Sequence, residues 1–465
     1  MSTAIMEADL ERKLIEQYKT LCRSIVPKNM TRPQGEKWAN HCVEEQAAIL
    51  DLLFLIFYYH SCQPAILLSL ARLFQQNSFG IKQLCHNLLS ETGRQAVARI
   101  GDLCAFILIE GFKLEDLLQE DKDAKKHALL HHRAMDGLQS ELSSWGALPQ
   151  HASVLLAWAT VLCRAEQLQL SDFEYQQHAQ RAYALDVFEQ LNKVLDQNWA
   201  NDGPNAVGYK SKLKTLLSIV FVSFDIWPLL ASQQQPLVSL YCKIFDENPP
   251  LCDQFWSLDY NIPPYRQLLD TLTLQFPASF DPLLSVLTSL CVDADSAWNI
   301  FHFLGNLSTL STEITDQDVA AGGWVNMELD PGQSDDESDD ENSSAAAANR
   351  GATRSKQLVA RRAFRVSGHL AVREGDHGHL VSIGTQRHLA VWRISYSAWP
   401  LMLNAIDDFL ALLTSYRRID PLRIRQAANS VRVILSLLER LLERGPRLGE
   451  ALLEHLEQHL PPTQQ

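Results

Sequence analysis

The sequence contains no CxxC cysteine pair, and its nine cysteines lie scattered along 465 residues. It also has no glycine-rich phosphate-binding loop and no H-E-x-x-H zinc signature. An odd, scattered set of cysteines is typical of reduced thiols in a cytosolic or nuclear protein, and not of a disulfide framework. These absences disfavour nucleotide-binding enzymes, zinc proteases and disulfide-rich secreted proteins.

Excess positive charge and a membrane-length apolar run are missing as well. The formal net charge of -14 argues against a general nucleic-acid binder, which needs a basic face, so we expect no direct nucleic-acid contact. The run from Ala47 to Tyr59 is apolar apart from Asp51, and it ends at His60, which makes it too short to cross a bilayer. We therefore expect no transmembrane segment. The charged N-terminus lacks the apolar core of a signal peptide.

Strand-like alternation is nearly absent before residue 325, whereas apolar residues recur at helical spacing. The stretch from Trp38 to Phe79 predicts a helix that is apolar on nearly all sides and therefore buried. Pro64 then stands where a second helix would begin, since its fixed φ suits a first turn. We interpret this stretch as an antiparallel helix pair with one helix deep in a core.

Similar helical patterns continue to Leu307. About 300 residues is large for one compact helical core, so we predict an α-solenoid of stacked helix pairs, although no clean repeat consensus is present. The large aromatic residues at helical spacing are expected to anchor this core; they are Trp38, Phe54, Trp158, Trp256 and Phe276.

The character of the chain changes at Glu328, where eight acidic residues follow within residues 328–341. Such a segment cannot bury enough apolar surface to offset its ordering entropy, so 328–356 is predicted to be a disordered linker. Ser334 and Ser338 each begin an S-D-D-E run, the pattern that acidophilic kinases favour. Phosphorylation at these serines and a plain solvated linker both remain open.

From residue 357 to 398 the apolar period becomes two, and glycines punctuate four candidate strands, 358–366, 370–373, 379–383 and 389–394. Short strands in so few residues predict a small β-barrel. Trp392, Tyr396 and Trp399 are expected to lock this barrel to the next helix. The predicted organisation is a helix and connector at 1–30, a solenoid at 31–327, the linker at 328–356, the barrel insertion at 357–398 and further solenoid helices at 399–465.

We find no constellation that predicts catalysis. His127 and His131 are one helical turn apart and could share a metal, but a solvated polar face explains them better. The cluster Asp376, His377 and His379 is similarly best explained as a loop. Cys85-His86 and His41-Cys42 place cysteine beside histidine, yet neighbours in a helix point apart. We expect no catalytic residue, no cofactor and no metal.

Seven stretches, in order, carry a resemblance to a known family. The chain resembles the nucleoporin-188 family, whose members are large α-solenoid scaffold proteins of the inner ring of the nuclear pore. The matching stretches are MTRPQGEKWANHCVEEQAAILDLLFLIFYY, LFQQNSFGIKQ, RIGDLCAFILIEG, LPQHASVLLAWA, LCDQFWSLDY, FPASFDPLLSVLTSL and VWRISYSAWPLML. The last resembles the family's SH3-like insertion where it runs back into solenoid helices.

The resemblance implies a mostly α protein, an α-solenoid with a small inserted SH3-like β-barrel. It also implies a non-enzymatic scaffold at the nuclear pore complex in the nuclear envelope, with other scaffold and linker nucleoporins as partners and a role in protein and mRNA transport. Family members are longer at both ends, so a fragment, a truncated gene model and a shortened paralogue are all open. His377 stands between Gly375 and Gly378 where the family has an apolar residue.

Two further hypotheses remain beside the scaffold. A helical solenoid could instead act like a transport receptor and bind Phe-Gly repeats or cargo peptides in pockets between helices. Weak, multivalent binding to Phe-Gly repeats would favour this alternative, and tight one-to-one binding to a scaffold peptide would favour the first hypothesis. An enzyme would need a helix-lined cleft with paired, perturbed carboxylates or a bound metal.

Overall fold

The structure is a computed structural model. It describes residues 2–119, 135–168, 174–257, 263–314, 324–327, 357–361, 363–367, 370–383, 387–414 and 421–459. The chain divides into two compact units, an N-terminal unit of residues 1–223 and a C-terminal unit of residues 224–465. The prediction of a mostly α protein is confirmed. The solenoid and the SH3-like form of the insertion stay predictions.

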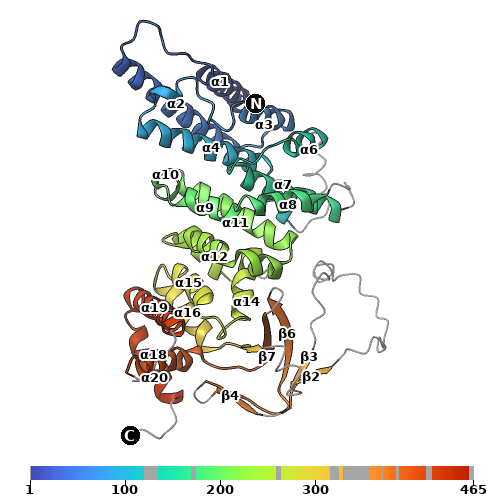
Figure 1. The fold of residues 1–465 in the computed structure, drawn as a ribbon, viewed down its shortest axis with the longest axis vertical. Helices are drawn as coiled ribbons and strands as arrows, with labels where there is room; N and C mark the ends of the chain where they lie inside the picture. The colour runs from blue at the N-terminus through green and yellow to red at the C-terminus, as the bar shows by residue number, and fades with distance from the viewer. Residues whose placement is uncertain are drawn as a thin grey trace. The chain divides into compact units, whose positions relative to one another are not determined.

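The elements of secondary structure described in the N-terminal unit are all helices (Figure 1). Its helices are α1 (Ser2–Cys22), α2 (Arg32–Tyr59), α3 (Pro64–Gln76), η1 (His86–Leu88), α4 (Glu91–Gly111), η2 (Asp116–Leu118), α6 (Met135–Ser143), α7 (His151–Gln167), α8 (Tyr175–Ala184), α9 (Val187–Leu195), α10 (Asn198–Asn201) and α11 (Ala206–Ser223). Prolines open α3 and the first turn of α2, as their fixed φ favours.

Helix α2 packs mainly against α4, and the two helices lie side by side in Figure 1. The predicted pairing of α2 with α3 is therefore corrected: α3 packs against α4 and α6 instead. The reason is the large apolar face of α4, where every residue from Leu103 to Gly111 is buried. At the centre of this contact the Phe54 ring meets Tyr209 of α11 at 4.7 Å and Phe106 of α4 at 6.2 Å between centroids.

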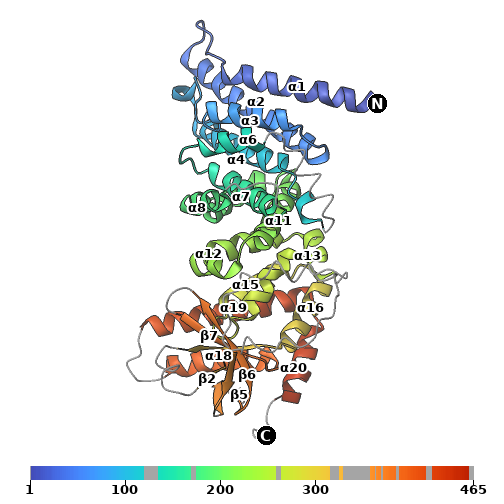
Figure 2. The same cartoon turned by 90° about the vertical axis from the view of Figure 1, so that its right-hand side faces the viewer.

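The expectation that α2 is buried on nearly all sides is also corrected. Leu52 is 50% exposed and Tyr59 is 75% exposed. Together with Leu10 and Leu14 of α1 they line a small apolar pocket of about 240 Å³, because α1 covers only part of this face. Figure 2 shows α1 alongside α2. Among the described residues, no helix is both long and apolar enough to span a membrane.

A buried ion cluster joins α4 to α11 in the same unit. The Glu110 side chain is fully buried, and its carboxylate lies 2.7 Å from Lys113 Nζ and 2.6 Å from Lys212 Nζ. Lys212 also pairs with Glu115. Burial lowers the pKa of Lys212, but the carboxylates of Glu110 and Glu115 outweigh it, so the net shift is upward and the ammonium stays charged.

The C-terminal unit combines helices with β-structure. Its helices are α12 (Ile226–Phe245), α13 (Pro249–Trp256), η3 (Pro264–Arg266), α14 (Gln267–Thr273), α15 (Asp281–Ser289), α16 (Ala294–Gly305), α18 (Ala398–Thr414), α19 (Pro421–Arg444) and α20 (Leu448–His459). Helix α12 is kinked at Gln233, three residues before Pro236, because proline cannot continue the hydrogen-bond ladder. Asp293 caps α16 by accepting a hydrogen bond from Ser296 N at 2.8 Å.

The strands form an antiparallel five-stranded sheet in the order β1-β7-β6-β3-β2 and a separate hairpin β4-β5. Their bounds are β1 (Leu310–Ile314), β2 (Trp324–Met327), β3 (Gln357–Ala360), β4 (Phe364–Ser367), β5 (Leu370–Val372), β6 (His377–Ile383) and β7 (Arg387–Trp392). Side chains from the sheet and the hairpin share one apolar core, which contains Leu310, Leu358, Val372 and Trp392.

The β-structure lies between α16 and α18 in the chain, and it begins at Leu310, before the predicted insertion at 357–398. Leu307 and Tyr396 pair through two backbone hydrogen bonds of 3.0 and 2.8 Å, so the chain enters and leaves the sheet at one point. Two strands, β1 and β2, were not expected from the sequence, and they fall within the predicted helical segment 31–327. The predicted strand 358–366 is in fact two strands, β3 and β4, which belong to different sheets.

Candidate functional site

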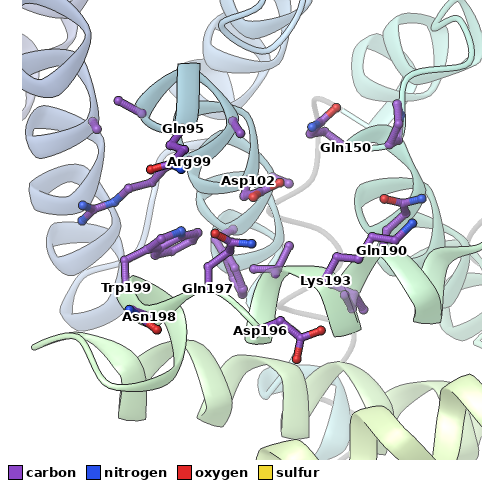
Figure 3. Close-up of a pocket in the computed structure, with 18 of the residues that line it drawn as sticks. Gln95, Arg99, Asp102, Gln150, Gln190, Lys193, Asp196, Gln197, Asn198 and Trp199 are labelled. Atoms are coloured by element: carbon purple, nitrogen blue, oxygen red, sulfur yellow. The ribbon is translucent and has the colours of Figure 1, made fainter. Parts of the chain in front are cut away.

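A cavity in the N-terminal unit opens between α4 and α9 and has a volume of about 900 Å³ (Figure 3). We call it the α4–α9 cavity. Helix α4 forms one wall, α9 and α10 form another, and Gln150 reaches in from the start of α7. Its lining includes the apolar residues Ala105, Phe106, Ile109, Leu191 and Val194, together with a larger number of polar and charged residues.

Local sequence positions the walls. Ser90 caps α4 by accepting a hydrogen bond from Gly93 N at 3.2 Å, which fixes where the helix begins. Helix α9 begins after Asp186, whose left-handed φ of 53° turns the chain out of α8. Phe188 of α9 is buried, whereas Gln190 and Lys193 of the same helix line the cavity.

Asp102 projects from α4 toward this cavity (Figure 3). Burial raises its pKa from the ordinary 3.8 to about 7, and a hydrogen bond with Gln150 partly opposes that shift. Within the described residues, Asp102 has no ion-pair partner. Gly101 permits the close approach of Gln150: a Cβ at this position would lie 3.2 Å from Gln150 Cγ and 3.0 Å from Phe79 O.

A second polar group borders the cavity. Arg99 of α4 pairs with Asp51 of α2, and its guanidinium carbon lies 5.3 Å from the centre of the Trp199 ring of α10. Tyr209 donates a hydrogen bond to the same Asp51. Burial raises the pKa of Asp51, whereas Tyr209 and Arg99 act in the opposite direction. This group therefore holds α2, α4, α10 and α11 together beside the cavity.

The comparisons with known proteins agree on one family. The family model for the N-terminal part of the nucleoporin Nup188 matches residues 2–320. The chain belongs to the Nup188 family of nucleoporins. It is similar to Nucleoporin NUP188 of Homo sapiens, with 26% identity over 466 aligned residues, 96% of this chain and 24% of the human protein. For the Mus musculus protein the identity is 25% with the same coverage.

Nucleoporin NUP188 of Xenopus tropicalis is 27% identical over 312 residues, 65% of this chain and 18% of that protein. The chain thus spans about a quarter of the length of the human and mouse Nup188 relatives. The α4–α9 cavity lies within the segment that the Nup188 model matches, whereas β2 to β7 and α18 to α20 lie beyond it.

Five of the aromatic residues proposed as core anchors are deeply buried: Phe54, Trp158, Phe276, Trp392 and Trp399. Trp38, Trp256 and Tyr396 are only half-buried. Trp256 is the last residue of α13, and Tyr396 lies in the connection before α18. Trp399 stacks on Phe301 of α16 at 5.5 Å and donates a hydrogen bond to its carbonyl oxygen.

The residues considered for metal binding or phosphorylation do not form a site within the described part of the chain. His127, His131, Ser334 and Ser338 lie outside the described residues. Asp376 accepts a hydrogen bond from Arg373 N at 2.7 Å, which is a turn contact. Within the described part of the chain, no group of three or more His, Cys, Asp or Glu residues is placed to hold a metal.

The cysteines beside histidines are not activated. All nine cysteines are free thiols. Burial raises the pKa of Cys42 to about 11 and also raises the pKa of Cys85, so both remain protonated at neutral pH. A thiolate nucleophile is therefore not formed at either position. Sequence reasoning missed Asp102, although a carboxylate near the start of the apolar stretch RIGDLCAFILIEG was a visible signal for it.

Proposed function

We propose that this chain is a non-enzymatic scaffold part of the nuclear pore complex that binds short peptide segments of other nucleoporins. Membership of the Nup188 family over residues 2–320 is the observation that carries this proposal. The role in nucleocytoplasmic transport then follows from the architecture that the scaffold supports. The partners would be other scaffold and linker nucleoporins of the inner ring.

The fold supplies a surface suited to this role. A peptide bound between helices needs apolar contacts and polar groups that fix its orientation, and the lining of the α4–α9 cavity supplies both. Rigid walls lower the entropic cost of binding. The aromatic contacts of Phe54, Phe106 and Tyr209 and the buried ion cluster around Glu110 provide such rigidity.

Recruitment to the nuclear rim tests this proposal. The full chain carrying a fluorescent tag should concentrate at nuclear pores. An excess of untagged chain should compete for the same sites and reduce the fluorescence at the pores. A diffuse distribution of a folded, tagged chain would contradict it.

One observation favours a second candidate, the transport-receptor-like binding of Phe-Gly repeats. The apolar pocket between α1 and α2 exposes Leu52 and Tyr59, and a phenylalanine ring could enter it. Replacing Leu52 by glutamate would abolish weak binding to immobilised Phe-Gly repeats if this pocket is used. Rim recruitment through scaffold contacts should survive the same change.

A further inference from the structure

We propose that the α4–α9 cavity accepts the lysine or arginine side chain of an extended peptide segment from a partner protein, with Asp102 as the counter-ion. This inference rests on the proposed function, because it names the chemistry by which the peptide is recognised.

Asp102 favours a cationic ligand because its carboxylate lies in the cavity wall without an ion-pair partner among the described residues. It faces the cavity, where burial raises its pKa and a hydrogen bond with Gln150 opposes the rise. Among the described residues, none of the charged residues in the cavity wall forms an ion pair with it. These charged wall residues are Glu44 of α2, Glu91, Arg94 and Arg99 of α4, and Lys193 and Asp196 at the end of α9. Arg94 is paired with Glu91 at 3.0 Å, and Arg99 with Asp51.

A carboxylate that is buried without a cation is costly, and a ligand that supplies the cation removes that cost. Gln150 adds a second hydrogen-bond acceptor at the same place. Its Oε1 is buried and has no hydrogen-bond partner among the described residues. A carboxylate and an amide oxygen side by side both accept hydrogen bonds, so they match a group with several N–H donors. Lysine and arginine side chains are such groups.

The remaining walls favour a peptide over a free small amine. Gln95, Gln190, Gln197 and Asn198 line the cavity, and each carries an NH2 group that donates and a carbonyl oxygen that accepts, which complement the C=O and N–H groups of a peptide backbone. Pockets for drug-sized ligands measure roughly 300–1,000 Å³. At about 900 Å³ the cavity has room for a basic side chain together with the backbone on either side of it.

The proposal has a pH signature. The pKa of Asp102 lies near 7 in the free protein, so the carboxylate must lose its proton to pair with the ligand. The ionised fraction rises from about a tenth at pH 6 to about nine tenths at pH 8. Affinity for the basic peptide should therefore rise about tenfold over this range.

The test is a selection of peptides on the full chain, using a display library of random twelve-residue peptides at pH 8. The wild-type protein should enrich peptides that share one lysine or arginine at a fixed position. The Asp102→Asn protein should not enrich that residue. Calorimetry with a selected peptide should show at least tenfold weaker binding when norleucine replaces the basic residue. Free spermidine at the peptide's concentration should compete poorly.

Asp270→Asn is the matched control, because burial also raises the pKa of Asp270 in α14, outside the cavity. This variant should bind the selected peptides as the wild type does, and thermal melts should show that both variants fold. The inference is wrong if no peptide is enriched, if the enriched peptides lack a shared basic residue, or if Asp102→Asn binds them equally well. None of these results decides whether the wild-type chain is recruited to the nuclear rim. The rim experiment therefore tests the proposed function independently of this inference.

Discussion

Tyr209 donates a hydrogen bond to Asp51 with 2.5 Å between Oη and Oδ1, although 158 residues separate the two in sequence. Asp51 is the only charged residue in the apolar run from Ala47 to Tyr59. Its other oxygen pairs with Arg99, so one carboxylate connects α2, α4 and α11. Asp51, the charged residue within this apolar run, thus joins helices of the N-terminal unit through a hydrogen bond and an ion pair.

Removing the Tyr209 hydroxyl should destabilise that unit. Tyr209→Phe keeps the ring contacts with Phe54 and Phe106 but leaves Asp51 Oδ1 buried without its donor. We expect a loss of roughly 1–3 kcal/mol in the free energy of unfolding, measured by urea denaturation. Tyr59→Phe is the control, since Tyr59 is 75% exposed, and it should change little. Equal stability of the two variants would contradict the role given to Asp51.

The buried ion cluster predicts a larger effect. Lys212→Met leaves the fully buried Glu110 with one ammonium, that of Lys113, in place of two. Breaking a buried pair in this way typically costs roughly 3–5 kcal/mol. Arg94→Met removes the exposed pair with Glu91 and should cost less than about 1 kcal/mol. Similar losses from the two substitutions, in the same denaturation experiment, would show that the cluster contributes no more than a surface pair.

Asp102 predicts a pH dependence of stability. The folded protein holds this proton up to about pH 7, whereas the unfolded chain releases it near the ordinary pKa of 3.8. The stability from this group is therefore complete below about pH 4 and falls as the pH rises toward 7.

Asp102→Asn abolishes the titration, so its stability relative to the wild type should rise between pH 5 and pH 8, by roughly 1–3 kcal/mol. Urea titrations at several pH values measure this difference. Parallel pH profiles for the two proteins would show that Asp102 titrates normally.

The insertion offers a prediction in the C-terminal unit. Trp392 is fully buried in the β core and donates a hydrogen bond from Nε1 to Thr312 Oγ1 of β1 at 3.0 Å. Trp392→Phe should lose both core volume and this bond, at roughly 2–4 kcal/mol.

Thr312→Val keeps the shape and loses only the bond, so we expect roughly 0.5–1.5 kcal/mol. Thermal melts followed by near-ultraviolet circular dichroism separate the two effects. If Thr312→Val costs as much as Trp392→Phe, packing is not the dominant contribution of Trp392.

Local patterns in the sequence predicted a mostly α chain, but not which elements pack against one another. Apolar spacing and Pro64 place the start of α3, yet only the apolar face of α4 decides that α2 packs there. Strand β1 reads LSTEI, in which buried Ser311 breaks the alternation, so its pairing with β7 supplies the evidence for a strand. The cavity was missed for the same reason, since Asp102 and Gln150 meet only through the close approach at Gly101.

The central claim, that this chain alone carries a contact with the nuclear pore scaffold, is tested most directly by affinity capture. The tagged full chain would be incubated with nuclear-envelope extract, and the recovered proteins would be quantified by mass spectrometry against a tag-only control. We predict enrichment of inner-ring nucleoporins. A folded chain that recovers none of them would contradict the claim.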